Sequence, residues 1–321
     1  MKRLISCMVW VFALGLSGYL LGAPSGPVVF DTIVFEEHFD QPDGSLPDAG
    51  RWVIGHPDDP SGWFVLGRTF FPTPSQHPSA PFPHVEGGAC VIEHYHYNPF
   101  HLTPPKTTFL GGEIHTVMGF DPTKYYCFEA RVRWPEAPRG LVTSFFTYGY
   151  DVPHKDSDEI DFEFLSNEVF EPLPQVLTNT WNDSQQKAEQ KPIPELDITQ
   201  WQKFRIYWYP DPLAPKVEWT WFDPAGDEKL LRSETDIARI PDEPMSLYFN
   251  LWAPTSIWPK AYDATLEPHQ VDNGIMYEYW VDDVVVLVPE PTSCMILAIG
   301  AVWLLTGRTR WLRRPPEPGD G

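Results

Sequence analysis

Three acidic residues alternate with three apolar residues in one short stretch of the chain. From residue 159 to residue 164 the sequence reads EIDFEF. A β-strand sends successive side chains to opposite faces, so Glu159, Asp161 and Glu163 would share one face and the apolar residues the other. Three like charges side by side do not stabilise a fold, which indicates that the acidic face lines a cleft. A pair of carboxyl groups flanking a sugar bond is what glycoside hydrolysis requires.

The spacing of the outer two acids suits that chemistry. The Cα atoms of Glu159 and Glu163 would lie about 13 Å apart on a strand. Side chains that lean toward each other would bring the carboxyls to about 5.5 Å, the separation expected for a retaining mechanism. A solvated acidic face and a calcium site are the alternatives. The EF-hand pattern fails, because Ile160 stands at the fifth position from Asp156 and no glycine follows.

The two ends of the chain have the composition of targeting segments. Lys2 and Arg3 precede an apolar run from Leu4 to about Leu21, which predicts a secretory signal peptide over residues 1–26. An uncleaved membrane anchor is the alternative at this end.

The C-terminal end combines a VPEP box at residues 288–291, an apolar stretch over 292–305 and a cluster of arginines up to Arg314. At 1.5 Å per residue the stretch would span about 21 Å, so a transmembrane helix here would be short for a ~30 Å hydrocarbon core. The order of these parts over 288–314 resembles the PEP-CTERM sorting signal of Gram-negative bacteria. That resemblance implies an exosortase-type processing enzyme as a partner and a surface or extracellular destination. Residues 315–321 would be a polar tail, and a plain tail anchor is the alternative.

Residues 28–287, between these ends, have the size of one large domain. The formal net charge of the 321 residues is −21 at pH 7, and the cationic residues gather partly in the two ends. A strongly acidic domain argues against nucleic acid and against heavily sulfated polymers as partners. Contact with a membrane is expected only through the terminal segments, and a monomer is the default expectation.

The pattern of the domain predicts an all-β sandwich. Short segments rich in β-branched and aromatic residues are separated by Pro, Gly, Asp and Asn. Residues 57–83 and 182–194 are predicted to be loops. Cys90 and Cys127 could form a disulfide in a secreted protein or remain two buried thiols in adjacent strands, and the sequence leaves both open. The segments predicted as strands are 126–134, 141–148, 159–165, 204–209, 217–222, 246–252 and 280–287.

The stretch DEIDFEFL at residues 158–165 resembles the signature of glycoside hydrolase family 16, in the form of bacterial licheninases and plant xyloglucan endotransglycosylase/hydrolases. Weaker similarities follow in the expected order, and together they span about residues 34–287. The resemblance implies a two-sheet antiparallel β-jelly-roll sandwich, concanavalin A-like, with a concave substrate cleft. The further similar stretches are 112–116, 126–132, 140–148, 248–252 and 279–284.

The same resemblance assigns roles to the acids. Glu159 would be the nucleophile, Glu163 the general acid/base, and Asp161 would assist by hydrogen bonding to a catalytic glutamate. Ionised Glu159 is expected to raise the pKa of Glu163 by repulsion between like charges. The unbroken alternation indicates a regular strand, whereas some relatives carry an extra residue before the last Glu, and hence a bulge.

A sugar-binding cleft needs aromatic side chains and polar partners for hydroxyl groups. One departure from the family concerns His115, which stands where the family has an arginine. A permanently charged guanidinium is therefore replaced by a titratable imidazole. This puts a licheninase specificity in doubt. The substrate-binding residues implied by the resemblance are Glu113, His115, Phe146, Tyr148, Trp181, Asn250, Trp252 and Trp258.

The chemistry requires no cofactor, although Asp282 matches the position of an aspartate through which some relatives hold a structural calcium. These inferences predict a secreted or surface-directed retaining endo-β-glycosidase that acts by double displacement, with a β-1,3-1,4-glucan or a related β-glucan as substrate. A transglycosylase is one alternative. A carbohydrate-binding surface protein without turnover is another, but the presence of all three acids argues against it. The sequence does not decide which polymer is bound.

Overall fold

The computed structural model describes residues 28–59, 64–97, 108–151, 156–183, 185–269 and 271–290. The chain divides into a compact unit over Ile33–Val288 and a second unit formed by Met1–Thr32 and Pro289–Gly321. The predicted signal peptide and most of the predicted sorting segment, including its apolar stretch, lie outside the described residues. Within the described ranges we find no helix with the length and apolar character needed to cross a membrane.

Seven strands form the first sheet, in the order β13-β12-β11-β10-β17-β8-β2. All of its neighbouring pairs are antiparallel. Its strands are β2 (Trp52–Ile54), β8 (Glu113–Thr116), β10 (Val142–Asp151), β11 (Asp156–Leu165), β12 (Gln175–Asn182), β13 (Gln185–Pro192) and β17 (Ser246–Trp252).

Eleven strands form the second sheet, whose main path is β16-β15-β14-β9-β18-β6-β7-β4-β3, with β1 paired to β18 and β5 paired to β6. The pairing of β4 with β7 is parallel. Two helical turns are described, α1 (Ser166–Val169) and the 3-10 helix η1 (Ile237–Arg239). The strands of this sheet are β1 (Phe30–Glu37), β3 (Val65–Leu66), β4 (Thr69–Phe70), β5 (His84–Glu86), β6 (Ala89–Tyr95), β7 (Phe109–Gly111), β9 (Tyr126–Arg133), β14 (Gln202–Tyr209), β15 (Lys216–Phe222), β16 (Glu228–Glu234) and β18 (Met276–Pro289).

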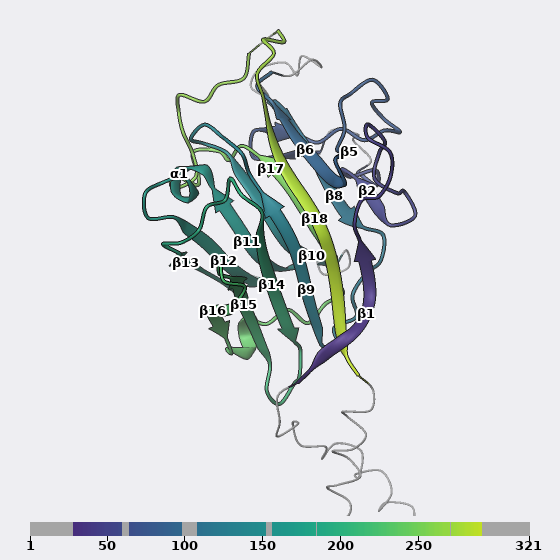
Figure 1. Cartoon of the computed structure of the whole chain (residues 1–321), viewed down its shortest axis with the longest axis vertical. Coiled ribbons are helices and arrows are strands. Elements are labelled where there is room, and N and C mark those ends of the chain that lie inside the picture. The colour runs from purple at the N-terminus through teal and green to yellow at the C-terminus, as the bar shows by residue number, and fades with distance from the viewer. Residues whose placement is uncertain are drawn as a thin grey trace, which may run out of the picture. The chain divides into compact units, whose positions relative to one another are not determined.

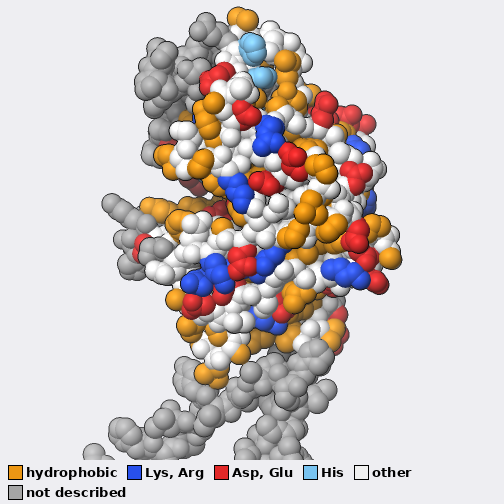
Figure 2. Space-filling model, turned by 90° about the vertical axis from the view of Figure 1, so that its left-hand side faces the viewer, with side chains coloured by type: hydrophobic (Ala, Val, Ile, Leu, Met, Phe, Trp, Pro, Cys, Tyr) orange, Lys and Arg blue, Asp and Glu red, His pale blue; other side chains and the backbone are white. Residues whose placement is uncertain are grey.

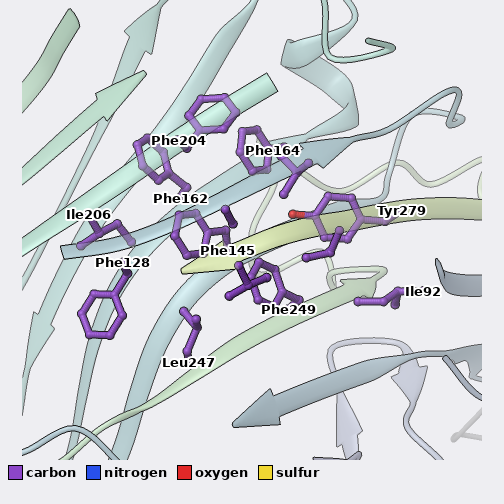
Figure 3. Packing of buried hydrophobic residues seen from close by; sticks show 14 of the residues in the cluster. Ile92, Phe128, Phe145, Phe162, Phe164, Phe204, Ile206, Leu247, Phe249 and Tyr279 are labelled. Atoms are coloured by element: carbon purple, nitrogen blue, oxygen red, sulfur yellow. The ribbon is translucent and has the colours of Figure 1, made fainter. Parts of the chain in front are cut away.

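The two sheets pack face to face around an aromatic core (Figure 1). Phe162 of β11 and Phe204 of β14 come from different sheets, and their ring centroids are 5.0 Å apart. Phe145 and Phe249 add a stacked pair within the first sheet, with centroids 5.4 Å apart (Figure 3). Each fully buried phenylalanine contributes about 1.5–3 kcal/mol by leaving water. The predicted all-β jelly-roll sandwich is therefore confirmed.

Two predictions about loops are wrong in part. Residues 182–194 contain strand β13, which pairs with β12 in continuous register. Its composition is polar because β13 is an edge strand, on which Lys187 and Lys191 form ion pairs with Glu189. Residues 57–83 contain the short strands β3 and β4. Such short or polar strands lack the apolar alternation on which the prediction relied.

The two cysteines of the domain, for which the sequence left a disulfide and two free thiols open, do not form a disulfide. Cys90 and Cys127 are both free and buried. Burial raises the pKa of both thiols, which makes them poor nucleophiles. They act as small apolar side chains of the core.

Candidate active site

The acidic face of β11 points away from the core. Ile160, Phe162 and Phe164 have no exposed surface, so the residues between them lie on the other face of the sheet. Glu159 and Glu163 are half-buried there, and Asp161 is 2% exposed. The pairing of β11 with β10 runs without a shift over the whole strand, as the unbroken alternation predicts.

The strand register shows which other side chains share this face, because residues directly opposite each other in neighbouring strands project to the same side. Tyr148 and Phe146 of β10 lie opposite Glu159 and Asp161. The same rule, applied across β12, β17 and β8, places every predicted substrate-binding residue of these strands on the face of the carboxylates. They are Glu113, His115, Phe146, Tyr148, Trp181, Asn250 and Trp252.

Trp258 is the one predicted contact outside a strand. It lies in the loop after β17, with its ring centroid 5.8 Å from that of Trp252. Both tryptophans pack against a small apolar cluster on the carboxylate face, formed by Val142, Leu165, Leu177 and Ala261. A space-filling view shows a recess in the surface with acidic side chains inside it (Figure 2).

Burial controls the protonation of the three acids. It raises the pKa of Glu159 to about 7 and that of Glu163 to about 8. The pKa of Asp161 is raised well above its usual range, by burial first and by the charges of both glutamates second. The direction predicted for Glu163 agrees with this result, but repulsion by Glu159 is the smaller cause and burial the larger. The pKa of Glu159 is raised as well, also by burial first.

Asp161 is held in place from two sides. Asn179 of β12 donates a hydrogen bond from Nδ2 to Asp161 Oδ2 at 2.9 Å. The carboxyl of Glu159, next on the same face of β11, interacts with that of Asp161, which lowers the pKa of Glu159 and raises that of Asp161. Of the two carboxyls, that of Asp161 therefore keeps its proton more readily. This contact stabilises the ionised form of Glu159 against the cost of burial.

A second polar group lies on β8, β17 and the segment after β2. Glu113 is 3% exposed, and its Oε1 lies 2.5 Å from His56 Nε2. Asn250 Nδ2 donates to Glu113 Oε2 at 3.1 Å. His115 stacks on Tyr248 with centroids 4.5 Å apart, and burial lowers the pKa of His115 to about 4. The ring of His115 is therefore uncharged at neutral pH.

Sequence reasoning missed three residues of the carboxylate face and its edge, namely His56, Asn179 and Tyr248. Tyr248 could have been found, because it alternates with Asn250 and Trp252 in the same strand. Asn179 follows from the pairing of β12 with β11. His56 lies just beyond a three-residue strand, and no pattern in the sequence predicts its contact with Glu113.

Asp158, the first residue of the signature, has no access to the carboxylate face. Its side chain is 1% exposed and accepts hydrogen bonds from three backbone N–H groups, those of Asp242, Glu243 and Asp183, at 2.7, 2.9 and 3.3 Å. It ties the beginning of β11 to two other segments.

We expect Asp158→Ala to lower the free energy of unfolding by about 2–3 kcal/mol, since buried donors lose a charged acceptor. Urea denaturation measures this loss, with exposed Asp156→Ala as the control. Equal midpoints for the two variants would refute the role.

The predicted metal ligand Asp282 lies on β18 in a cluster of another kind. His38, Asp282 and Asp283 each offer one donor atom, and these atoms lie within 4.8 Å of one another. Arg131 Nη1 lies 2.6 Å from Asp283 Oδ2 and 3.6 Å from Asp282 Oδ2. Calcium takes six to eight oxygen ligands, whereas here the guanidinium of Arg131 lies within ion-pair distance of both carboxylates and a ring nitrogen of His38 is the third donor. As placed, these residues do not fit a calcium ion.

The chain is similar to known proteins in sequence and in fold. The sequence model for "Glycosyl hydrolases family 16" matches residues 91–270, more than half of the 321 residues. Xyloglucan endotransglucosylase/hydrolase protein 2 of Arabidopsis thaliana is 29% identical over 165 residues, which are 47% of this chain and 50% of that protein. The chain spans half or less of the length of the curated relatives that it matches.

Solved structures share the fold at low sequence identity. A prokaryotic beta-1,3-1,4-glucanase (lichenase) from a mouse hindgut metagenome superposes with a TM-score of 0.56 and 20% identity, covering 80% of this chain and 99% of that one. The catalytic domain of an endo-1,3-beta-glucanase (laminarinase) from Thermotoga petrophila gives a TM-score of 0.59 and 17% identity, with 82% and 100% covered. At these identities the likeness is one of fold.

Proposed function

The chain belongs to glycosyl hydrolase family 16, and from this premise we propose that it cleaves internal bonds of a β-glucan with retention of the anomeric configuration. One observation carries the proposal: Glu159 and Glu163 stand on the same face of β11, on either side of Asp161, with a row of aromatic side chains beside them. Retention is characteristic of the family, and a β-1,3-1,4-glucan or a related β-glucan is the proposed substrate.

Each of the two glutamates would take part in both steps of the reaction. Glu163 donates its proton to the glycosidic oxygen while ionised Glu159 attacks the anomeric carbon, so that the leaving sugar departs as an alcohol. Glu163, now ionised, takes a proton from a water molecule that attacks the same carbon and releases Glu159. Asp161 donates its hydrogen bond to Glu159 and orients it for the attack.

Transfer to a sugar is the second candidate. A curated relative is named as a transglucosylase/hydrolase, and the covalent intermediate is the same in both reactions; only the acceptor differs. Incubation of the enzyme with a β-glucan and a labelled oligosaccharide separates them. A label found in long chains indicates transfer, whereas a label that stays in the oligosaccharide indicates hydrolysis.

The proposed roles predict a narrow pH optimum. Activity requires ionised Glu159 and protonated Glu163, so kcat/KM should rise as the pH passes the pKa of Glu159, about 7, and fall as it passes that of Glu163, about 8. Each limb should change about tenfold per pH unit away from the optimum. The profile is measured with a soluble β-glucan between pH 5 and pH 10. A flat profile across this range would contradict the assignment of both groups.

A panel of purified polysaccharides tests the substrate. We expect release of oligosaccharides from mixed-linkage or β-1,3-linked glucans, with linkage analysis of the products identifying the bond cut. Proton NMR during the first minutes should show the β-anomer as the first product. Activity confined to galactans would overturn the substrate, and a first product in the α-form would overturn the mechanism.

Export to the cell surface remains part of the proposal. The composition of residues 1–26 and 288–314 supports it, with an exosortase-type enzyme as the processing partner. Fractionation of cells that express the full chain, together with mass spectrometry of its ends, tests both the destination and the removal of these segments. A full-length protein in the cytoplasm would contradict the proposal.

A further inference from the structure

We propose that Arg68 and Asn167 are positioning residues: they hold the loop over residues 253–266, and through this loop they hold Trp258 in place on the carboxylate face. The inference rests on the proposed function, in which Trp258 is a predicted contact of the sugar chain. It extends that function to two residues that belong to the turn between β3 and β4 and to α1. We call residues 253–266, which follow β17 directly, the tryptophan loop.

The tryptophan loop is irregular. All of its residues are described, and they form turns rather than a strand. The backbone N–H groups of Ala261 and Tyr262 both donate to the carbonyl of Trp258, at 3.2 and 3.0 Å. Ile257, next to the indole, is 90% exposed, whereas Ala261 is fully buried. Because such a segment has no sheet ladder to fix its course, its position depends on side chains of other elements.

Arg68 joins the two ends of the tryptophan loop. At the beginning of the loop its Nε donates to the carbonyl of Pro254 at 2.9 Å. At the end its Nη1 and Nη2 donate to the carbonyls of Leu266 and Asp263, at 2.6 and 3.3 Å. The planar guanidinium presents its donors in a fixed fork, so these bonds fix the three carbonyls relative to one another.

Arg68 is itself held rigidly. Its guanidinium lies over the rings of Tyr262 and Phe109, 4.7 and 5.4 Å from their centroids, and its side chain is 13% exposed. Its backbone N–H donates to the carbonyl of Ala253 at 2.7 Å. Gly67, with a φ of +58°, approaches that carbonyl so closely that a Cβ would lie 2.5 Å from it, which only glycine permits. The turn between β3 and β4 therefore packs directly against the tryptophan loop.

Asn167 ties the middle of the tryptophan loop to the end of β11. It is the second residue of α1, which begins directly after β11, and it is 5% exposed. Its Nδ2 donates to the carbonyl of Lys260 at 2.8 Å, and its Oδ1 accepts from the backbone N–H of Gly140 at 2.8 Å. The amide has partners on both sides, so its orientation is fixed.

These two tethers should affect binding more than chemistry. Among the described residues, neither side chain makes a hydrogen bond or an ion pair with the three acids of β11. Their effect would pass through Trp258, whose indole is fixed before the ligand binds and so loses little entropy on binding. A contact made equally with the bound substrate and with the transition state lowers KM and leaves kcat unchanged.

A double-mutant cycle on the β-glucan that the wild type cleaves tests whether Arg68 acts through Trp258. Arg68→Met keeps most of the length of the side chain and removes its donors. It should raise KM about fivefold with kcat within about twofold, Trp258→Ala should raise KM about tenfold, and the double variant should match Trp258→Ala alone. Arg68→Lys should restore part of the loss. Arg239→Met is the matched control, since Arg239 pairs with Asp236 at 3.4 Å on η1, and its KM should equal that of the wild type.

Trypsin provides a measurement that does not depend on activity. The bond after Lys260 lies in the tryptophan loop, and its carbonyl is the one that Asn167 binds. Loss of a tether should let the loop open more often, so cleavage there should be about tenfold faster in Arg68→Met and in Asn167→Ala. Mass spectrometry of the fragments identifies this cut. Cleavage after Lys203, which lies in strand β14, reports global unfolding in the same samples.

The outcomes separate this inference from the proposed function. The inference is overturned by KM losses of Arg68→Met and Trp258→Ala that add up in the double variant, or by an unchanged KM in Arg68→Met. Cleavage after Lys260 that rises only together with cleavage after Lys203 would overturn it as well, because it would show a defect of the whole fold. A wild type that cleaves no β-glucan would refute the proposed function and the role in binding with it. In that case the wild type itself is inactive, so the two failures are distinguishable.

Discussion

Replacing Glu159 with glutamine is expected to lower kcat on a β-glucan by at least about 10³-fold, in line with the loss of one member of a catalytic unit. Glutamine preserves the shape of the side chain but cannot attack the anomeric carbon, so the covalent intermediate does not form. Binding of the polysaccharide should persist, because the aromatic row on β10 and β17 is unchanged. Reducing-sugar assays and affinity electrophoresis measure the two quantities on the same preparation.

The pKa of the remaining glutamate provides an internal check on this variant. The charge of Glu159 contributes to the raised pKa of Glu163, so the pKa of Glu163 should fall in Glu159→Gln. Glu218→Gln serves as the control, because Glu218 pairs with Lys216 on the second sheet and should retain full activity. Equal sugar release by Glu159→Gln and the wild type would exclude Glu159 as the nucleophile.

Replacing Glu163 with glutamine should be comparably severe on a natural polysaccharide, with a loss of about 10²–10⁴-fold, the usual contribution of general acid–base catalysis. The reason is different, because the leaving sugar would have to depart as an unstable alkoxide. With an aryl glycoside the leaving group departs as a phenolate and needs no proton, so the rate of the first step should fall much less. Rate measurements on both substrates separate the loss of proton donation from a general defect.

The second step of the same variant can be restored chemically. Azide needs no general base, so it should attack the accumulated intermediate and form a glycosyl azide with retained configuration. The rate on the aryl glycoside should therefore increase with the concentration of azide. An equal loss on both substrates, without any effect of azide, would show that Glu163 has another role.

The acidic strand could be predicted from sequence because one pattern specifies both of its faces. Ile160, Phe162 and Phe164 are core because they alternate with acids that cannot be buried without cost. The sandwich follows from many such strands. Strand β13 was not predicted because it is an edge strand, and an edge strand need not be apolar. Pairing with β12 stabilises it, and that pairing is a property of the tertiary structure.

The electrostatics of the site could be predicted only in direction. Repulsion between Glu159 and Glu163 was visible in their spacing, but burial is the larger cause of both pKa shifts. The degree of burial depends on neighbouring strands that the local sequence does not specify. The contact between His56 and Glu113 joins residues far apart in the chain, so only the folded structure reveals it.

Mass spectrometry of a trapped intermediate is the most direct test of the assignment of Glu159. A β-glucan oligosaccharide with fluorine at C2 and a good leaving group at C1 should form the glycosyl-enzyme quickly and release it slowly. Peptide mapping should then locate the added sugar on Glu159 within the segment Asp156–Leu165. A sugar attached to any other residue, or no attachment while the enzyme still cleaves β-glucan, would contradict the mechanism.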